Sequence, residues 1–241
     1  MAKRLYVDAR LAPDTDLTLD PDRSHYLCRV LRLRRGERVE LFCGDGLAYD
    51  AAIAAADARA CDVRVGAIVA REAAPRVRLH LAQALMKGDR IDFVLQKATE
   101  LGVTDIRFTE TEHTVVHIEG PRVVRRETHW RAVIASAAEQ CGRLWLPTLH
   151  TPQPFGELLR QHIAAQTLLL DPGAAPLGAT IPLVDTMLLI GPEGGLSDAE
   201  RDAAIASGAR PVGLGRLVLR TDTAPIAAVA VLRQAWGWDA P

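Results

Sequence analysis

Short apolar segments separated by turn residues fill the first part of the chain. Residues 39–43, 49–53 and 63–69 each have the length and apolar content of a β-strand, and a Gly-Asp-Gly turn separates the first two. Because strands this close in sequence pair with one another, we expect a small β-barrel. Residues 25–31 are predicted to form one or two helical turns that end before Gly36.

The pattern changes beyond residue 76, where single strands alternate with helices. Five strands are predicted, at residues 77–84, 105–109, 167–170, 187–190 and 211–214. One helix begins near Ile91 and ends before Gly102, and a second runs from Pro121 to Gly142. This alternation predicts an α/β fold in which a mostly parallel sheet is covered by helices on both faces.

A linker at residues 73–75, Ala-Ala-Pro, separates the two patterns. We therefore expect two domains, residues 1–73 and residues 74–241, and the 49% apolar content is sufficient for both cores. No apolar run reaches the roughly 18 residues that span a bilayer, and the chain start lacks the apolar core of a signal peptide. We expect a cytoplasmic protein with no membrane segment.

The cysteines and histidines do not form a metal-binding pattern. No C-x-x-C pair occurs, so we expect free thiols in a reducing compartment at Cys28, Cys43, Cys61 and Cys141. His113 and His117 are four residues apart, and residues 114–116 between them are predicted as a strand, which would put both rings on one face. With no third ligand evident, no metal site is predicted.

Positive charge is concentrated in one segment, although the formal net charge of the chain is only −1. Residues 23–38 contain a single acid, Glu37, and the six arginines Arg23, Arg29, Arg32, Arg34, Arg35 and Arg38, a local charge of +5. Such a segment is a candidate for binding a polyanion such as RNA. Arg143, at the end of the second helix, suits the negative end of the helix dipole as well as it suits RNA binding.

A glycine-rich loop, residues 191–195, follows a buried strand and precedes a helix. Ser197 and Glu200 have the spacing of a capping box at the start of that helix. Ligands of open α/β sheets bind outside the carboxyl ends of strands, and glycines allow the backbone to approach a ligand closely, so we expect a small molecule here. The alternative is a tight turn that needs glycine for its own sake. Neither the dinucleotide fingerprint nor the P-loop is present, which argues against a nicotinamide oxidoreductase.

A second unusual segment ends at Arg220 and leads into an apolar helix. Thr221 or Thr223 is predicted to cap this helix, Pro225 suits its first turn, and Asp222 suits the positive end of its dipole. Arg220 opposes that dipole, at a cost of roughly 0.3 to 1 kcal/mol. Because local conflicts of this kind concentrate at functional sites, Arg220 is a candidate catalytic residue. The alternative is a salt bridge to a nearby acid.

Five segments together resemble the ribosomal RNA small subunit methyltransferase E family, of the SPOUT superfamily, over essentially the whole chain. They are HYLCRVLR at residues 25–32, KGDR at 87–90 with QKATELGV at 96–103, EQCGR at 139–143, IGPEGGLS at 190–197, and LG at 214–215 with LRT at 219–221. Each motif alone is weak, but five in this order and spacing are specific.

The resemblance implies a PUA-like RNA-binding β-barrel at residues 1–73 and a SPOUT methyltransferase domain at residues 74–241, whose C-terminal chain threads into a trefoil knot. It implies S-adenosylmethionine as methyl donor, S-adenosylhomocysteine as product, N3 of a uridine in 16S rRNA as acceptor, small-subunit rRNA or the assembled subunit as partner, and a homodimer. The implied cofactor-binding residues are Leu170, Ile190, Gly191, Glu193, Gly194, Gly195, Leu214, Gly215, Leu217, Leu219 and Thr221. Asp222 stands where the family more often has Glu, and His113 where Arg is common.

The resemblance also suggests roles for the arginines. Arg220 would stabilise the N3-deprotonated uracil or orient the base, since a guanidinium is not a base at neutral pH. Glu193, Asp222 or solvent would accept the proton. The expected RNA-binding residues are Arg4, Arg23, Arg29, Arg32, Arg34, Arg35 and Arg143. The alternatives are a SPOUT methyltransferase acting on another RNA or at a ribose 2′-hydroxyl, and a catalytically silent RNA-binding or assembly protein.

Overall fold

The chain divides into two compact units in the computed structural model, which describes residues 3–88, 90–118, 120–178 and 180–237. The first unit comprises Met1–Ala74 and Ala138–Leu146, and the second comprises Pro75–Ala137 and Pro147–Pro241. Asp89, which belongs to one of the five motifs, and the first two residues of the chain lie outside the described residues.

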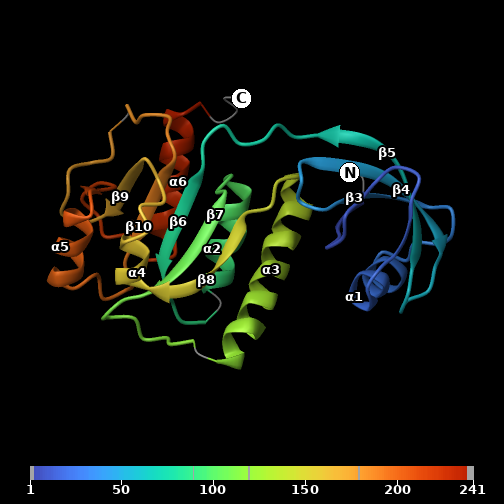
Figure 1. Ribbon diagram of the computed structural model, residues 1–241, viewed down its shortest axis with the longest axis horizontal. Helices are drawn as coiled ribbons and strands as arrows, with labels where there is room; N and C mark the ends of the chain where they lie inside the picture. Colours follow the sequence, from blue (N-terminus) through green and yellow to red (C-terminus); the bar gives the residue numbers. More distant parts are fainter. Residues whose placement is uncertain (1–2, 89, 119, 179, 238–241) are drawn as a thin grey trace. The chain divides into compact units, whose positions relative to one another are not determined.

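The first unit is built on a curled, five-stranded sheet, drawn in blue to teal in Figure 1. In the order β1-β3-β4-β5-β2, its strands are Arg4–Tyr6, Arg38–Phe42, Leu47–Ala55, Asp62–Arg71 and Asp16–Thr18. Only the β1–β3 pair is parallel. The three predicted strands and their barrel-like arrangement are confirmed. The edge strands β1 and β2 were not predicted, because three residues are too few to show a period.

The helical segment of the first unit begins earlier than predicted. Helix α1 spans Pro21–His25, and a π-helical turn, η1, continues it over Tyr26–Val30. The Asp20 carboxylate caps α1 by accepting a hydrogen bond from the Arg23 amide (2.9 Å). An Asp followed by Pro is a recognisable helix start, so this signal was present in the sequence.

The second unit is a six-stranded, entirely parallel sheet. In the order β11-β9-β10-β6-β7-β8, its strands are Ala209–Val212, Gln166–Leu170, Thr186–Ile190, Leu79–Ala84, Asp105–Glu110 and Thr148–Pro154. The two central strands, β10 and β6, are buried along their whole length. All five predicted strands are confirmed, with small shifts in their ends. The edge strand β8 was missed because it contains prolines and polar residues, which an edge strand tolerates.

Helices cover both faces of this sheet, as predicted (Figure 1). They are α2 (Arg90–Glu100), α3 (Pro121–Cys141), α4 (Phe155–Leu159), α5 (Asp198–Ala206) and α6 (Thr223–Ala235). Adjacent residues of β6 show the two sides, because side chains alternate along a strand. Ala82 packs with residues of α4 and α5, whereas Leu81 lies with residues of α2 and α6. None of the helices in the described part of the chain is long and apolar enough to cross a membrane.

Two local predictions were wrong. Residues 114–116 are not a strand, because β7 ends at Glu110 and the chain turns: the Thr111 amide donates to the Thr114 hydroxyl (2.9 Å), and the Thr114 amide to the Thr111 carbonyl (3.0 Å). Helix α6 is capped by neither predicted threonine. Its N-cap residue is Asp222, which accepts no side-chain capping bond. The capping box of α5, by contrast, is confirmed.

Candidate functional site

A cavity of about 350 Å³ opens in the second unit where three neighbouring strands end. Its walls are the turns that follow the carboxyl ends of β9, β10 and β11, together with the start of α6. This is the position at which open α/β sheets bind ligands. The turns at which the sequence predicts a small-molecule site therefore enclose a concave pocket.

Ten of the eleven residues predicted to bind the cofactor line this cavity: Leu170, Ile190, Gly191, Glu193, Gly194, Gly195, Leu214, Leu217, Leu219 and Thr221. Gly215 does not line it, and its φ of +105° instead serves the backbone of the turn. Sequence reasoning missed several lining residues, among them Asp171, Arg201 and Gly213. Asp171 directly follows β9, so its place at a strand end was the available signal.

The glycine-rich loop is both a turn and a cavity wall. The Gly195 amide donates to the Pro192 carbonyl (2.9 Å), and Gly195 has a φ of +74°. A Cβ on Gly191 would lie 3.3 Å from the Leu196 side chain, and one on Gly194 would lie 3.2 Å from the His113 Cβ. The loop is therefore a tight turn that needs glycine, and the same residues also line the cavity.

Gly213 makes the closest backbone approach in the cavity wall. A Cβ there would lie only 2.6 Å from the Ala174 carbonyl oxygen. The Gly213 amide donates to the Ala175 carbonyl (2.8 Å), and its own carbonyl accepts from the Leu177 amide (2.7 Å). Residues 171–177 and the end of β11 are thus held together without room for any side chain at this position.

Charged side chains at and next to the cavity form one ion pair and one group of three residues. Arg201 Nε donates to Asp171 Oδ2 (2.8 Å), and this bond holds the pKa of the Asp171 carboxyl below its usual value. Arg90, at the start of α2, pairs with Glu193 of the glycine-rich loop (3.1 Å) and lies 4.0 Å from the Asp222 carboxylate. Arg90 therefore ties the turn after β10 to the start of α6, a role that its motif did not reveal.

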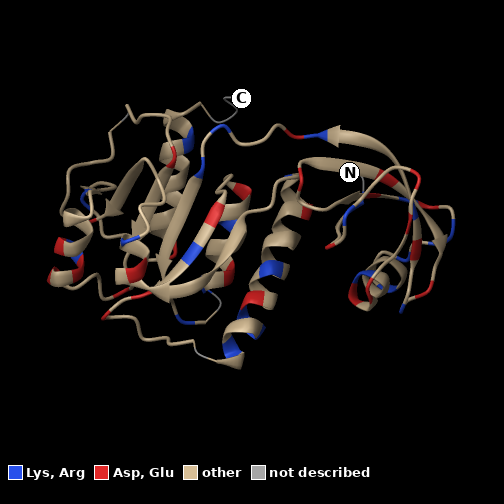
Figure 2. Ribbon diagram, viewed as in Figure 1, with Lys and Arg blue, Asp and Glu red and all other residues tan. Residues whose placement is uncertain are grey.

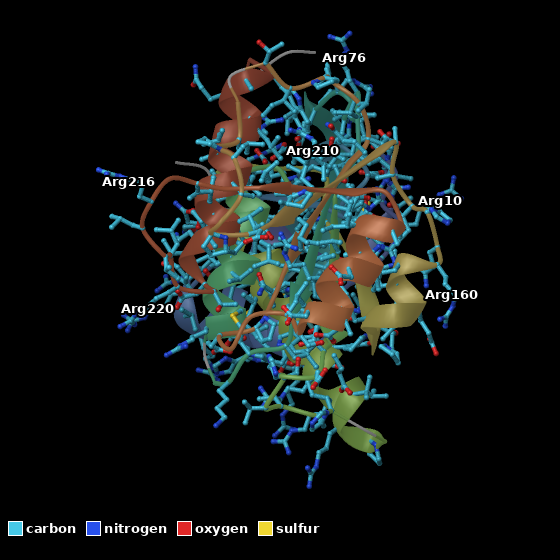
Figure 3. All side chains as sticks on the ribbon, turned by 90° about the vertical axis from the view of Figure 1, so that its left-hand side faces the viewer. Arg10, Arg76, Arg160, Arg210, Arg216 and Arg220 are labelled. Atoms are coloured by element: carbon cyan, nitrogen blue, oxygen red, sulfur yellow. The ribbon has the colours of Figure 1, made fainter. Side chains whose placement is uncertain are left out.

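Arg220 lies between two cavity-lining residues, and its side chain is exposed. Its carbonyl accepts hydrogen bonds from the Thr223 and Ala224 amides (both 2.9 Å), which fixes the backbone at the start of α6. Within the described residues Arg220 has no ion-pair partner, so the salt-bridge alternative is not supported. Figure 3 shows Arg220 and Arg216 projecting outward.

The segment after β7 is attached to the glycine-rich loop. His113 Nδ1 lies 3.0 Å from the Gly195 carbonyl, and the Glu112 amide donates to Glu200 Oε1 (2.8 Å). His117 pairs instead with Glu110 (3.2 Å). The two histidines thus have separate partners, and the described residues contain no cluster of side chains suited to a metal ion.

The arginines predicted to bind RNA, all in the first unit, fall into two groups. Arg4 pairs with Glu40 (2.8 Å) and Arg23 with Glu139 (3.0 Å), and both are largely shielded from solvent. Arg38 pairs with Asp50, and Arg143 is half-buried. The remaining four are exposed and have no ion pair to any residue that the structure describes: Arg29, Arg32, Arg34 and Arg35. These four form the more accessible basic surface of the segment.

Glu139, the first residue of the EQCGR motif, holds two other segments of the first unit. Its Oε1 accepts hydrogen bonds from the Tyr6 amide (2.8 Å) and from Arg23 (3.0 Å). Burial raises the pKa of the Glu139 carboxyl, while these donors act in the opposite direction. Glu139 therefore organises the first unit, and its role is structural.

Comparison with known proteins agrees with the geometry. Residues 73–233 match the family described as RNA methyltransferase domain, and residues 19–66 match RNA methyltransferase PUA domain. A ribosomal RNA small subunit methyltransferase E from Synechocystis is 33% identical, over 95% of this chain and 77% of its own length. The protein of the same name from Mycobacterium tuberculosis is also 33% identical, over 98% of this chain and 94% of its own.

Two solved structures have the same fold over 98% of both chains. One, from Legionella pneumophila, is 34% identical with a TM-score of 0.91 and contains the cofactor S-adenosylmethionine. The other is a ribosomal RNA small subunit methyltransferase E from Neisseria gonorrhoeae, 30% identical with a TM-score of 0.90, bound to S-adenosylmethionine. With the RNA methyltransferase domain matched over more than half of its residues, and with these relatives aligned along nearly its whole length, the chain belongs to the ribosomal RNA small subunit methyltransferase E family.

Proposed function

We propose that this protein transfers a methyl group from S-adenosylmethionine to N3 of a uridine in 16S rRNA, in free RNA or the assembled small subunit, and releases S-adenosylhomocysteine. The observation that carries the proposal is the cavity at the carboxyl ends of β9, β10 and β11, because its walls include two of the sequence motifs of the family. The Legionella and Neisseria relatives bind S-adenosylmethionine.

The cavity suits this cofactor in size and chemistry. Its volume of about 350 Å³ falls in the range of roughly 300 to 1,000 Å³ typical of small-molecule sites. Leucine side chains and glycine backbone would hold the flat adenine ring, and the Asp171 and Glu193 carboxylates, each already paired with an arginine, would accept hydrogen bonds from hydroxyl or amino groups of the ligand. The ten lining residues named above would hold the cofactor, and Gly215 would support the turn.

Bound S-adenosylmethionine supplies an electrophilic methyl group, so the protein must orient donor and acceptor and needs no nucleophile of its own. Uridine N3 lies on the base-pairing edge, so the base must be unpaired before it can react. Arg220 then stabilises the negative charge that develops on the uracil as the N3 proton leaves. Glu193 and Asp222, which both face Arg90, or solvent accept that proton.

Phosphate binding by the first unit anchors the substrate in this proposal. Arg29, Arg32, Arg34 and Arg35 contribute most, because their side chains are exposed. Arg4, Arg23 and Arg143 contribute less, since they are shielded or half-buried. The active enzyme is a homodimer with a trefoil-knotted cofactor site, two further parts of the proposal that rest on the family resemblance.

The direct test is a reaction with S-adenosylmethionine carrying an isotopically labelled methyl group, followed by mass analysis of the nucleosides. Small-subunit rRNA and assembled subunits lacking the modification serve as substrates. Labelled 3-methyluridine is expected. A label on ribose would indicate a 2′-O-methyltransferase, and cofactor binding without transfer to either substrate would indicate an RNA-binding or assembly protein.

Arg220→Ala tests the proposed catalytic residue. Cofactor affinity should persist, because the Arg220 side chain does not line the cavity, while methyl transfer should fall by about 100-fold or more, as for other groups that stabilise developing charge. Arg216→Ala is the matched control: Arg216 is exposed on the same loop, does not line the cavity and is labelled beside Arg220 in Figure 3. Equal activity in the two variants would remove Arg220 from the mechanism.

A further inference from the structure

The first half of helix α3 carries a basic face, and none of the residues predicted to bind RNA lies on it. Residues 121–129 of this helix are exposed or half-exposed, and Trp130 is its first buried residue, packed against Phe108 with ring centroids 4.7 Å apart. In Figure 1 this end of α3 extends beyond the strands of the parallel sheet. The helix is thus anchored from His129, whose Nε2 lies 2.7 Å from Asp92 Oδ2 of α2, and from Trp130 onward, while residues 121–126 are available to contact a partner.

Three arginines occupy one side of this exposed portion. Arg122, Arg125 and Arg126 have the i, i+3, i+4 spacing that places side chains on one helix face. All three are exposed and form no ion pair with any residue in the described ranges, and Glu127 is the only acid in residues 121–129. Figure 2 shows these blue bands at the free end of α3, with a single red band among them.

This arrangement works against the stability of the helix. The first turn of α3 contains no acid, although acids are favoured at the positive end of a helix dipole. Like charges three and four residues apart also repel one another. Because nothing among the described side chains offsets the three charges, they are suited to an external polyanion.

The basic face begins at the same sheet edge as the cofactor cavity. The segment from the carboxyl end of β7 to α3 is fastened to the glycine-rich loop by His113, whose Nδ1 lies 3.0 Å from the Gly195 carbonyl. A second attachment joins the Glu112 amide to Glu200 Oε1 (2.8 Å). A polyanion lying along α3 would therefore be directed toward the turns that form the cavity.

We propose that Arg122, Arg125 and Arg126 bind backbone phosphates of the substrate RNA and hold the strand next to the target nucleotide. This inference rests on the proposed function, since it takes RNA as the substrate, but it places an RNA-binding surface in the methyltransferase unit itself. Phosphate contacts of this kind position an RNA without reading its sequence.

The test is the triple variant Arg122→Gln/Arg125→Gln/Arg126→Gln, assayed with the rRNA substrate at several salt concentrations. Glutamine matches arginine in helix propensity, so the variant should fold, and its thermal unfolding midpoint should not fall. We expect the slope of log affinity against log salt to become shallower by about 2 to 3, and the KM for RNA to rise. Affinity for S-adenosylmethionine should stay within twofold of the wild type.

The matched control is Arg76→Gln/Arg160→Gln/Arg210→Gln, which removes the same charge from exposed positions of the same unit. Figure 3 labels these side chains at the top and right of the view, whereas α3 begins at the bottom. An unchanged salt slope in the α3 variant, or an equal change in the control, would overturn the proposal. A shift in oligomeric state with unchanged RNA affinity would also overturn it, because a second copy would then occupy the face. If the wild type methylates no RNA, the proposed function itself fails, a result visible before any variant is made.

Discussion

Replacing Gly213 by alanine should weaken cofactor binding without unfolding the protein. The new Cβ would lie 2.6 Å from the Ala174 carbonyl oxygen, whereas ordinary contact begins at 3.4 Å, so the backbone must separate by about 0.8 Å. That movement displaces the cavity wall and strains the two hydrogen bonds that join Gly213 to Ala175 and Leu177. Overpacking of this kind costs about 1 to 3 kcal/mol. The free protein relieves this strain by moving the wall, and the cofactor must restore the wall in order to bind, so we predict a roughly 5- to 150-fold higher Kd for S-adenosylmethionine.

Titration calorimetry with S-adenosylmethionine measures this effect, and circular dichroism checks that the variant is folded. Gly178→Ala is the control, because it lies in the connection between β9 and β10 against which Gly213 packs, and a Cβ there meets nothing within 4 Å. Its affinity should equal that of the wild type. If Gly213→Ala binds the cofactor within twofold of Gly178→Ala, the turn after β11 is not a wall of the cofactor site and the reasoning fails.

Three further predictions concern the second unit. Ser197→Ala should lower the free energy of unfolding in urea by about 1 kcal/mol, because it removes half of the capping box, and no change would mean that the cap contributes nothing. Arg90→Ala should raise the Kd for S-adenosylmethionine about two- to fivefold, because it releases Glu193 and an exposed ion pair contributes modestly. The Kd of Arg90→Lys should lie between those of the wild type and Arg90→Ala, and equal or tighter binding in Arg90→Ala would contradict this. Burial lowers the pKa of His80 from its usual 6.5, although Asp105 acts to raise it. The unfolded chain therefore takes up a proton at a higher pH than the folded protein does. The free energy of unfolding should fall as the pH drops below about 6.5, by at most about 1.4 kcal/mol per pH unit. His80→Leu should flatten this dependence between about pH 7 and 5 in urea unfolding, and an unaltered profile would assign it to other groups.

Features set by neighbouring residues were predictable from the sequence. The ends of α2 and α3 follow from Gly102 and Gly142, which have φ of +87° and +92° and stop each helix locally. The capping box of Ser197 and Glu200 is likewise a short-range signal. Central strands were predicted because burial on both faces favours apolar residues, as in β10, although the equally buried β6 also contains His80 and Gln83.

Features set by distant residues were not predictable in this way. Arg90 meets Glu193 and Asp222 only because the sheet brings three separate strand–helix connections together. Arg4 and Arg23 looked as available for RNA as the other arginines, since their partners lie 36 and 116 residues away in sequence. The local sequence pattern predicts which turns form the site, whereas the contacts between those turns can be seen only in the folded structure.

The measurement that tests the central claim most directly is a crystal structure of the protein grown with S-adenosylmethionine. We predict one cofactor molecule per chain, enclosed by the turns after β9, β10 and β11 and in contact with Gly191 and Leu219. Electron density for the cofactor at any other place, or a crystal in which this cavity holds no cofactor at saturating concentration, would contradict the account.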